Sequence, residues 1–289
     1  IEYHRSKRAD VTVGMMVVPK SEIHQFGAGI VDDKNRIIDW EEKPKNPRTN
    51  LASMGIYVFD YRYLVKTLIR DRQELDFGMH ILPRAIEEDN VFAYPFYGYW
   101  RDVGTIQAYW EANMDVLGKD TGISPQAWEI RTNVETEGRL TDRPPARFGE
   151  NTHLEHCMVC AGSNIQGAVI NSVLSPGVVV EEGAVVRDSI VFEDCIIKKG
   201  ATVDLAILDK RVQVGEGAIV GNGDGMQTVN KLQPTHLYTG ISLVGKETVV
   251  PPGMVIGRNC VIDSGVVPVD FPSEQIGDGE SLLLSKKEQ

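Results

Sequence analysis

A six-residue repeat of aliphatic side chains constrains the fold of this chain more than any other feature. Two runs of aliphatic residues keep this spacing: Val173, Val179, Val185, Val191, Ile197 and Val203, then Val244, Val250, Ile256 and Ile262. Neither the helical period of 3.6 nor the strand period of 2 produces it. A hexapeptide repeat is typical of a parallel β-helix, in which three hexads form one triangular coil of about 18 residues. We therefore expect a left-handed parallel β-helix over residues 151–265, with these side chains inside it.

The expected coils make two predictions about particular residues. Val185 should point into the prism, so that Val185→Asp should collapse the C-terminal half of the chain. Glycines should stand at the corners, and we assign them to Gly177, Gly183, Gly200, Gly215 and Gly217.

Composition excludes several classes of function. The chain has 289 residues, enough for two domains, and a net charge of −11, which argues against nucleic acid or an anionic membrane as the main partner. Phosphate ligands remain possible, because they need only a local cation. Four cysteines are too few for a disulfide framework, and neither a signal peptide nor an apolar run of about 18 residues is visible. We expect a cytoplasmic protein.

The first 120 residues alternate predicted strands and helices, as in an α/β domain. We expect strands at 11–18, 52–60 and 91–99, a hairpin joining 29–32 to 35–40, and helices at 61–73 and 106–117, the last capped by Thr105. Residues 121–150 are predicted to be a linker, and residues 266–289 a tail or cap. Because the chain opens at Ile1 and enters a strand within about ten residues, we expect it to begin inside a longer domain.

Three segments of this part carry candidate ligand-binding groups. Lys43 stands at the end of a strand, where an ammonium suits a phosphate monoester, and Pro44 predicts an extended backbone for it. Ser53 stands at the head of the next strand, and Asp102 lies in a strand-to-helix connection where a carboxylate can hold Mg²⁺. Taken singly, each also fits an ordinary role: a solvated loop, a strand start, and an aspartate that pairs with Arg101 or caps the helix.

Taken together, these segments resemble the glucose-1-phosphate adenylyltransferase (ADP-glucose pyrophosphorylase) family. The resemblance rests on five motifs in this order: Phe26-Gly27, Glu42-Lys-Pro, Ala52-Ser-Met-Gly-Ile-Tyr, Asp76-Phe-Gly and Tyr99-Trp-Arg-Asp-Val-Gly-Thr105. It extends from about Ala9 to Ile262. It implies that residues 1–120 are the C-terminal part of a Rossmann-like nucleotidyltransferase domain, placed ahead of the hexapeptide β-helix.

The resemblance also implies roles for individual residues. Gly27, Glu42, Lys43 and Ser53 would contact glucose 1-phosphate, with Lys43 on the phosphate and Glu42 on the sugar hydroxyls, and Asp102 would hold catalytic Mg²⁺. Members of the family transfer AMP from ATP to glucose 1-phosphate in the first committed step of glycogen or starch synthesis. They are usually tetramers regulated by sugar-phosphate metabolites. The family's Gly-rich loop over the nucleotide phosphates is absent, so the chain alone is expected to have little or no activity.

Three alternatives stay open at this point. The first is a pyrophosphorylase for another sugar or nucleotide, because the base-reading segment is missing from the chain. The second is a hexapeptide-repeat acyltransferase, and the third is a non-catalytic regulatory or assembly subunit. The glycine cluster at 221–225 lacks the strand and helix that a phosphate loop requires and is interpreted as a turn.

Overall fold

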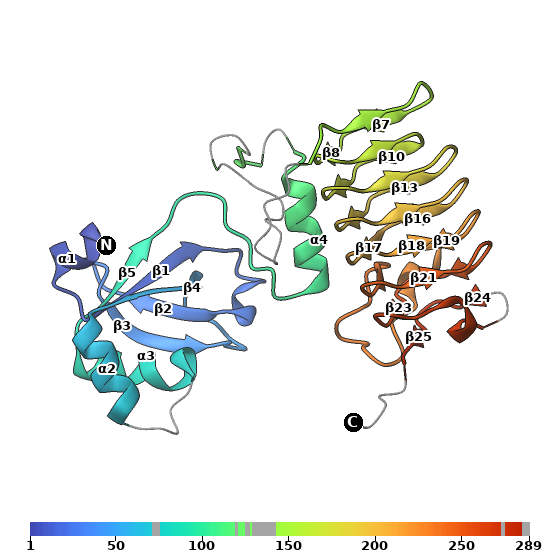
Figure 1. Ribbon diagram of the computed structural model, residues 1–289. Helices are drawn as coiled ribbons and strands as arrows, with labels where there is room; N and C mark the ends of the chain where they lie inside the picture. The colour runs from blue at the N-terminus through green and yellow to red at the C-terminus, as the bar shows by residue number, and fades with distance from the viewer. Residues whose placement is uncertain (71–75, 119–120, 125–127, 129–142, 273–274, 285–289) are drawn as a thin grey trace. The chain divides into compact units, whose positions relative to one another are not determined.

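The chain divides into two compact units, Ile1–Trp100 and Arg101–Gln289, which we describe separately (Figure 1). The computed structural model describes residues 1–70, 76–118, 121–124, 128, 143–272 and 275–284. Each unit has a hydrophobic core of its own. None of the helices in these ranges is long and apolar enough to cross a membrane.

The described part of the first unit forms a five-stranded sheet in the order β3-β2-β4-β1-β5. Its elements are α1 (Glu2–Lys7), β1 (Val11–Val17), the 3₁₀ turn η1 (Ile23–Gln25), β2 (Gly27–Val31), β3 (Ile37–Glu42), β4 (Leu51–Phe59), α2 (Tyr61–Arg70), the π-helical turn η2 (Phe77–Ile81), α3 (Leu82–Glu88) and β5 (Val91–Pro95). β1 and β5 run parallel, and the other neighbouring strands run antiparallel. The predicted strands and the hairpin are confirmed, although β5 ends earlier than expected.

The core of this sheet explains why β1 is almost continuously apolar. Val11, Val13 and Met15 are fully buried, and Leu82 and Ala85 of α3 complete the same cluster. Because both faces of such a strand are buried, apolar residues do not alternate with polar ones along it. β1 is an inner strand between β4 and β5, and the strands that carry the candidate site lie on its β4 side.

The second unit is a helix followed by a parallel β-solenoid, as the hexapeptide repeat predicts. The elements before the long loop are α4 (Ile106–Asp115), β6 (Arg147–Phe148), β7 (His153–Glu155), β8 (Met158–Val159), β9 (Asn164–Ile165), β10 (Ala168–Ile170), β11 (Val173–Leu174), β12 (Val179–Val180), β13 (Val185–Arg187), β14 (Ile190–Val191), β15 (Ile196–Ile197), β16 (Thr202–Asp204), β17 (Ala206–Leu208), β18 (Gln213–Val214) and β19 (Ile219–Val220). After it come the 3₁₀ turn η3 (Gly225–Gln227), β20 (Ser242–Val244), β21 (Val249–Val250), β22 (Val255–Ile256), β23 (Val261–Ile262), the 3₁₀ turn η4 (Pro268–Asp270), β24 (Gln275–Ile276) and β25 (Ser281–Leu282). In the described ranges these strands form three sheets of seven, seven and six strands. The left hand of the solenoid stays a prediction.

The coils are one residue shorter than three hexads, and this corrects the predicted interior. Val185 pairs with Ala168 on one side and with Thr202 on the other, 17 residues away in each direction. The buried core therefore steps by six, six and five residues, through Leu174, Val180, Val186, Val191, Ile197, Val203, Leu208, Val214 and Val220. The prediction that Val185 is interior is wrong: Val185 is half-buried and its neighbour Val186 fills the prism. Adjacent valines made the two phases indistinguishable in the sequence.

Two kinds of constraint act on the predicted corner glycines. Gly177, Gly183, Gly200 and Gly217 have φ between 64° and 78°, a conformation that L-residues with a side chain rarely adopt. Gly215 is required for a different reason. A Cβ there would lie 2.5 Å from the backbone nitrogen of Pro252 in the next coil. Glycine at 215 therefore permits the close approach of two coils.

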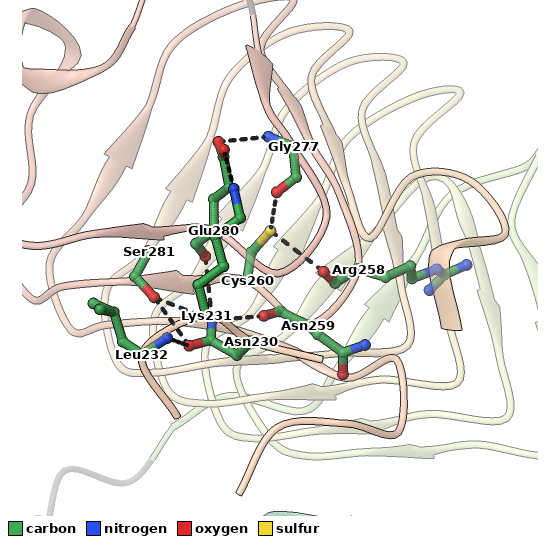
Figure 2. A network of polar contacts seen from close by, with 9 residues as sticks. All are labelled: Asn230, Lys231, Leu232, Arg258, Asn259, Cys260, Gly277, Glu280 and Ser281. Atoms are coloured by element: carbon green, nitrogen blue, oxygen red, sulfur yellow. Dashed lines mark hydrogen bonds and ion pairs between the residues drawn. The ribbon is translucent and has the colours of Figure 1, made fainter. Parts of the chain in front are cut away.

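A loop over residues 221–241 separates β19 from β20 and is tied to the last coils by buried amides. The Asn230 side chain is fully buried; its amide nitrogen donates to the Asn259 carbonyl at 2.8 Å, and its oxygen accepts the backbone N–H of Leu232 at 3.0 Å. Figure 2 shows this network, together with the ion pair between Lys231 and Glu280 (2.9 Å). The loop contains the glycine cluster 221–225, so the turn interpretation fits its place between coils.

The solenoid extends beyond the expected boundaries at both ends. β6 begins at Arg147, inside the predicted linker, and β24 and β25 pair with β22 and β23 inside the predicted tail. Residues 129–142 of the linker and 285–289 of the tail lie outside the described residues. Ahead of the solenoid, Thr105 caps α4 as predicted, because its hydroxyl accepts the Ala108 N–H at 3.1 Å.

Candidate active site

Three of the predicted site residues stand in one row across neighbouring strands of the first unit. Gly27 of β2 pairs with Glu42 of β3, and Ala28 of β2 pairs with Ala52 of β4. Since β2 and β4 are antiparallel, one step along each strand brings Gly27 opposite Ser53. Residues opposite one another in a sheet point to the same face. The fold therefore places Glu42, Gly27 and Ser53 side by side.

The glycine in the middle of this row leaves room for the side chains on either side of it. A Cβ on Gly27 would lie 2.8 Å from Oε2 of Glu42 and would overlap the indole ring of Trp40. Gly27 itself is buried. The glycine therefore makes room beside β2 for the Trp40 ring and for the half-buried Glu42 carboxylate.

Lys43 ends the strand in a conformation that the sequence did not predict. Its φ is 46°, in the left-handed region, and the expectation of an extended backbone before Pro44 is wrong. The Lys43 N–H donates to the Phe26 carbonyl at 3.0 Å, and this bond closes the β2–β3 pairing. A left-handed backbone at a non-glycine residue costs about 1–3 kcal/mol and often marks a functional position. β3 ends at Glu42, so the strict alternation of faces does not continue to Lys43.

The Lys43 ammonium is available to a ligand. The side chain is exposed, and it makes no ion pair with any residue that the structure describes. An unpaired cation, a carboxylate and a hydroxyl are thus carried by neighbouring parts of the sheet. Chemically, such a set suits a molecule that carries both a phosphate and hydroxyl groups.

Ser53 belongs to a small polar and aromatic cluster that the sequence analysis left out. The Ser53 hydroxyl accepts the Gly55 N–H at 3.2 Å and also contacts the Tyr57 phenol. Burial raises the pKa of Tyr57, the hydrogen bond with Ser53 lowers it, and the charges of Glu42 and Asp76 raise it again. The ring of Phe77 stacks on Tyr57 with 5.5 Å between centroids.

A sequence signal for this cluster existed, because Tyr57, Asp76 and Phe77 fall within two of the motifs that carry the family resemblance. A third motif approaches the row as well. The Trp100 ring lies edge-on to Phe26, with 5.6 Å between centroids. Four of the five motifs thus contribute residues to the row or to its immediate neighbours, and the fifth begins next to it.

Asp102 lies in the second unit, so its distance from Lys43 stays a prediction. Its carboxylate is exposed, and the ordinary roles considered for it are filled by others. Arg101 pairs with Glu111 and with Asp115, the latter at 2.9 Å, and Thr105 caps α4.

A single exposed carboxylate fits Mg²⁺, which usually takes one or two protein carboxylates and completes its shell with water and phosphate oxygens. In the described ranges no three His, Cys, Asp or Glu side chains gather as a metal site. Asp102 is therefore the candidate Mg²⁺ ligand in the segment before α4.

Comparison with protein families agrees with this geometry. The nucleotidyl transferase family model matches residues 1–119, and the model of the GlmU-like C-terminal hexapeptide matches residues 144–244. These matches define the class of the chain: part of a nucleotidyl transferase domain with a mixed sheet, followed by a hexapeptide solenoid.

The relatives identify the family within that class. Proteins named glucose-1-phosphate adenylyltransferase from Acetivibrio thermocellus, Thermomicrobium roseum and Thermotoga sp. are 40%, 44% and 37% identical to this chain. The alignments cover 98%, 98% and 99% of this chain and 66%, 66% and 68% of the respective relatives. The chain belongs to the glucose-1-phosphate adenylyltransferase family and spans about two thirds of the length of these relatives.

Proposed function

We propose that the protein transfers AMP from ATP to glucose 1-phosphate, giving ADP-glucose and pyrophosphate in the first committed step of glycogen or starch synthesis. The observation that carries this proposal is the row of Glu42, Gly27 and Ser53 across three strands, with the unpaired Lys43 ammonium at its end. The names of the relatives, which specify glucose 1-phosphate and adenylyl transfer, support the choice of substrates.

Each residue of the row has a part in binding the sugar phosphate. Lys43 binds the phosphate, because a compact ammonium suits a monoester dianion. Glu42 accepts hydrogen bonds from sugar hydroxyls, and Ser53 lines the pocket beside it. Gly27 makes room for the Glu42 carboxylate beside the sugar, because a side chain at that position would collide with Glu42 and Trp40.

The reaction requires orientation more than covalent chemistry. A phosphate oxygen of glucose 1-phosphate attacks the α-phosphorus of ATP in line with the departing pyrophosphate, so no enzyme nucleophile is needed. Lys43 and Glu42 hold the attacking molecule from both ends, which converts an encounter in solution into a reaction of fixed partners. Asp102 would hold Mg²⁺, which neutralises charge on the reacting phosphates when it is bound.

Replacing the lysine tests the proposal. Lys43→Gln in the whole protein should raise the KM for glucose 1-phosphate at least tenfold, about 1.4 kcal/mol or more, and leave the KM for ATP nearly unchanged. Lys45→Gln, which removes the same charge from an exposed lysine two residues away, should change neither value. Equal losses for both substrates, or the same loss in Lys45→Gln, would contradict the assignment of Lys43.

The alternative functions differ in the substrates that the protein would consume in an assay. A panel of sugar 1-phosphates and nucleoside triphosphates separates a pyrophosphorylase of other specificity from the proposed one. A non-catalytic subunit would bind glucose 1-phosphate without turnover, whereas an acyltransferase would require an acyl donor. Preference for ATP and glucose 1-phosphate over the rest of the panel is the expected outcome.

Assembly and location follow the same family. We propose a cytoplasmic homotetramer regulated by sugar-phosphate metabolites. Cys157, Cys195 and Cys260 are free cysteines, as suits a reducing compartment. Light scattering on the whole protein measures the mass of the assembly.

A further inference from the structure

The Glu42 carboxylate sits in a slot made by Gly27 together with Trp40 and Gly78, two residues to which no role has been given. This inference rests on the proposed function, in which Glu42 accepts hydrogen bonds from the sugar. We propose that Trp40 is a positioning residue: its indole N–H holds one oxygen of Glu42 against Gly27 and Gly78, so that the other oxygen faces the sugar hydroxyls.

The indole reaches Glu42 along its own strand. Trp40 and Glu42 are two residues apart on β3, so their side chains leave the same face of the sheet. The indole Nε1–H donates to Oε2 of Glu42 at 3.3 Å. No described residue donates a hydrogen bond to the second oxygen, Oε1. The two oxygens of the carboxylate are therefore different in their surroundings.

Glycine forms both walls of the slot. A Cβ on Gly78 would overlap Oε2 of Glu42 and lie 2.9 Å from its carboxyl carbon. A Cβ on Gly27, on the other side, would lie 2.8 Å from the same oxygen and would overlap the Trp40 ring. Neither glycine needs its conformational freedom here, since both have φ outside the left-handed region. What they provide is space, and the carboxylate and the indole fill it.

The wall that carries Gly78 is itself held in place. Asp76 caps the π-helical turn, because its carboxylate accepts the Met79 N–H at 2.7 Å. Phe77 stacks on Tyr57 of β4. The cap and the stacked rings thus hold the turn that carries Gly78.

A mutant cycle tests whether Trp40 and Gly78 act through Glu42. We would measure the affinity of the chain for glucose 1-phosphate and for inorganic phosphate by titration calorimetry. Trp40→Phe, which keeps an aromatic ring but has no N–H, should weaken glucose 1-phosphate binding five- to tenfold. Gly78→Ala should weaken it at least tenfold. Phosphate affinity should change less than twofold in both variants, because Lys43 is untouched.

The background of the cycle is Glu42→Ala. Once the carboxylate is gone, neither Trp40→Phe nor Gly78→Ala should weaken glucose 1-phosphate binding further. Trp110→Phe, which removes an indole N–H that donates to the Asp188 carbonyl in the other unit, is the matched control and should leave both affinities unchanged.

The outcomes separate this inference from the proposed function. Losses that persist undiminished in the Glu42→Ala background, or that are equal for glucose 1-phosphate and inorganic phosphate, would overturn the positioning role alone. If the unchanged chain bound glucose 1-phosphate no better than inorganic phosphate, the proposed function would fail first, together with the ligand assumed here.

Discussion

The two units of the chain differ in how often an equivalent structural position recurs in the sequence. In the solenoid, equivalent inward positions recur in successive coils. Val180, Ile197 and Val214, for example, occupy the same position of the core in three neighbouring coils. In the sheet, the candidate-site residues Gly27 and Glu42 form a single pair between β2 and β3. A repeat therefore reveals the architecture and says little about chemistry, whereas the unique motifs reveal the chemistry and say little about the fold.

The largest effect is expected from a charge placed inside the repeat. Val186→Asp should destabilise the solenoid by about 4 kcal/mol or more, because it buries an unpaired carboxylate in the prism. Val185→Asp, one residue earlier and half-buried on the outside, should cost only about 1 kcal/mol. Thermal unfolding followed by circular dichroism measures both. Equal losses of stability in the two variants would mean that Val185 is as deeply buried as Val186, in contradiction to the described packing.

A smaller effect should separate a glycine of the solenoid from one of the sheet. Gly215→Ala should cost about 3 kcal/mol, because the new methyl group meets the backbone of the next coil, which cannot move alone. Gly29→Ala should cost about 1 kcal/mol, since its methyl group meets only the flexible end of the Met15 side chain at 2.7 Å. Chemical denaturation gives both values. A cost at Gly29 as large as that at Gly215 would show that the sheet is as tightly spaced as the coils.

The smallest of the three effects concerns the ion pairs that bind the inserted loop to the coils. Asp204 accepts hydrogen bonds from Arg187 and Arg258, and the nearly buried Arg258 also donates to the Gly223 carbonyl at 3.0 Å. Burial alone would raise the pKa of Asp204, but the Arg187 hydrogen bond and the charges of both arginines hold it below its ordinary value. Asp204→Asn should therefore cost about 2 kcal/mol at neutral pH.

The pH dependence of this contribution has a definite sign. Because the pKa of Asp204 is lower in the folded state, the stabilisation is complete above the ordinary aspartate pKa, near 4, and disappears as pH falls through the folded value. The difference between the unchanged protein and Asp204→Asn should accordingly shrink below about pH 4. Urea unfolding at several pH values tests this. A difference that stayed constant with pH would mean that the charge of Asp204 contributes nothing.

Much of the fold was readable from the sequence, and the errors have physical causes. The hexapeptide period predicted the solenoid, and alternation with turn residues predicted β1 to β4. The period could not fix the phase, because pairs such as Val179-Val180 and Val185-Val186 are aliphatic at both positions. Only strand pairing, which depends on contacts 17 residues apart, distinguishes the inner valine from the outer one.

The site was predicted less completely than the fold. Glu42, Gly27 and Ser53 stand in one row, and their contact with a shared ligand stays a prediction. The left-handed backbone of Lys43 could not be foreseen, because the residue before a proline normally avoids it; here the Phe26 carbonyl and the end of β3 select it. The role of Trp40 was also invisible, since its indole meets Glu42 only after the strand and the two glycines are in place.

The long loop between β19 and β20 affects how relatives should be compared. Leu208 pairs with Val244, which comes 36 residues later in the sequence. Their strands, β17 and β20, are nevertheless direct neighbours in the same sheet. Sequence separation therefore does not measure the number of coils beyond position 220, because the loop over residues 221–241 leaves the stacking of the strands unchanged. Alignments of homologous chains gain accuracy when gaps are confined to such corners and the inward aliphatic residue of each rung serves as the anchor column.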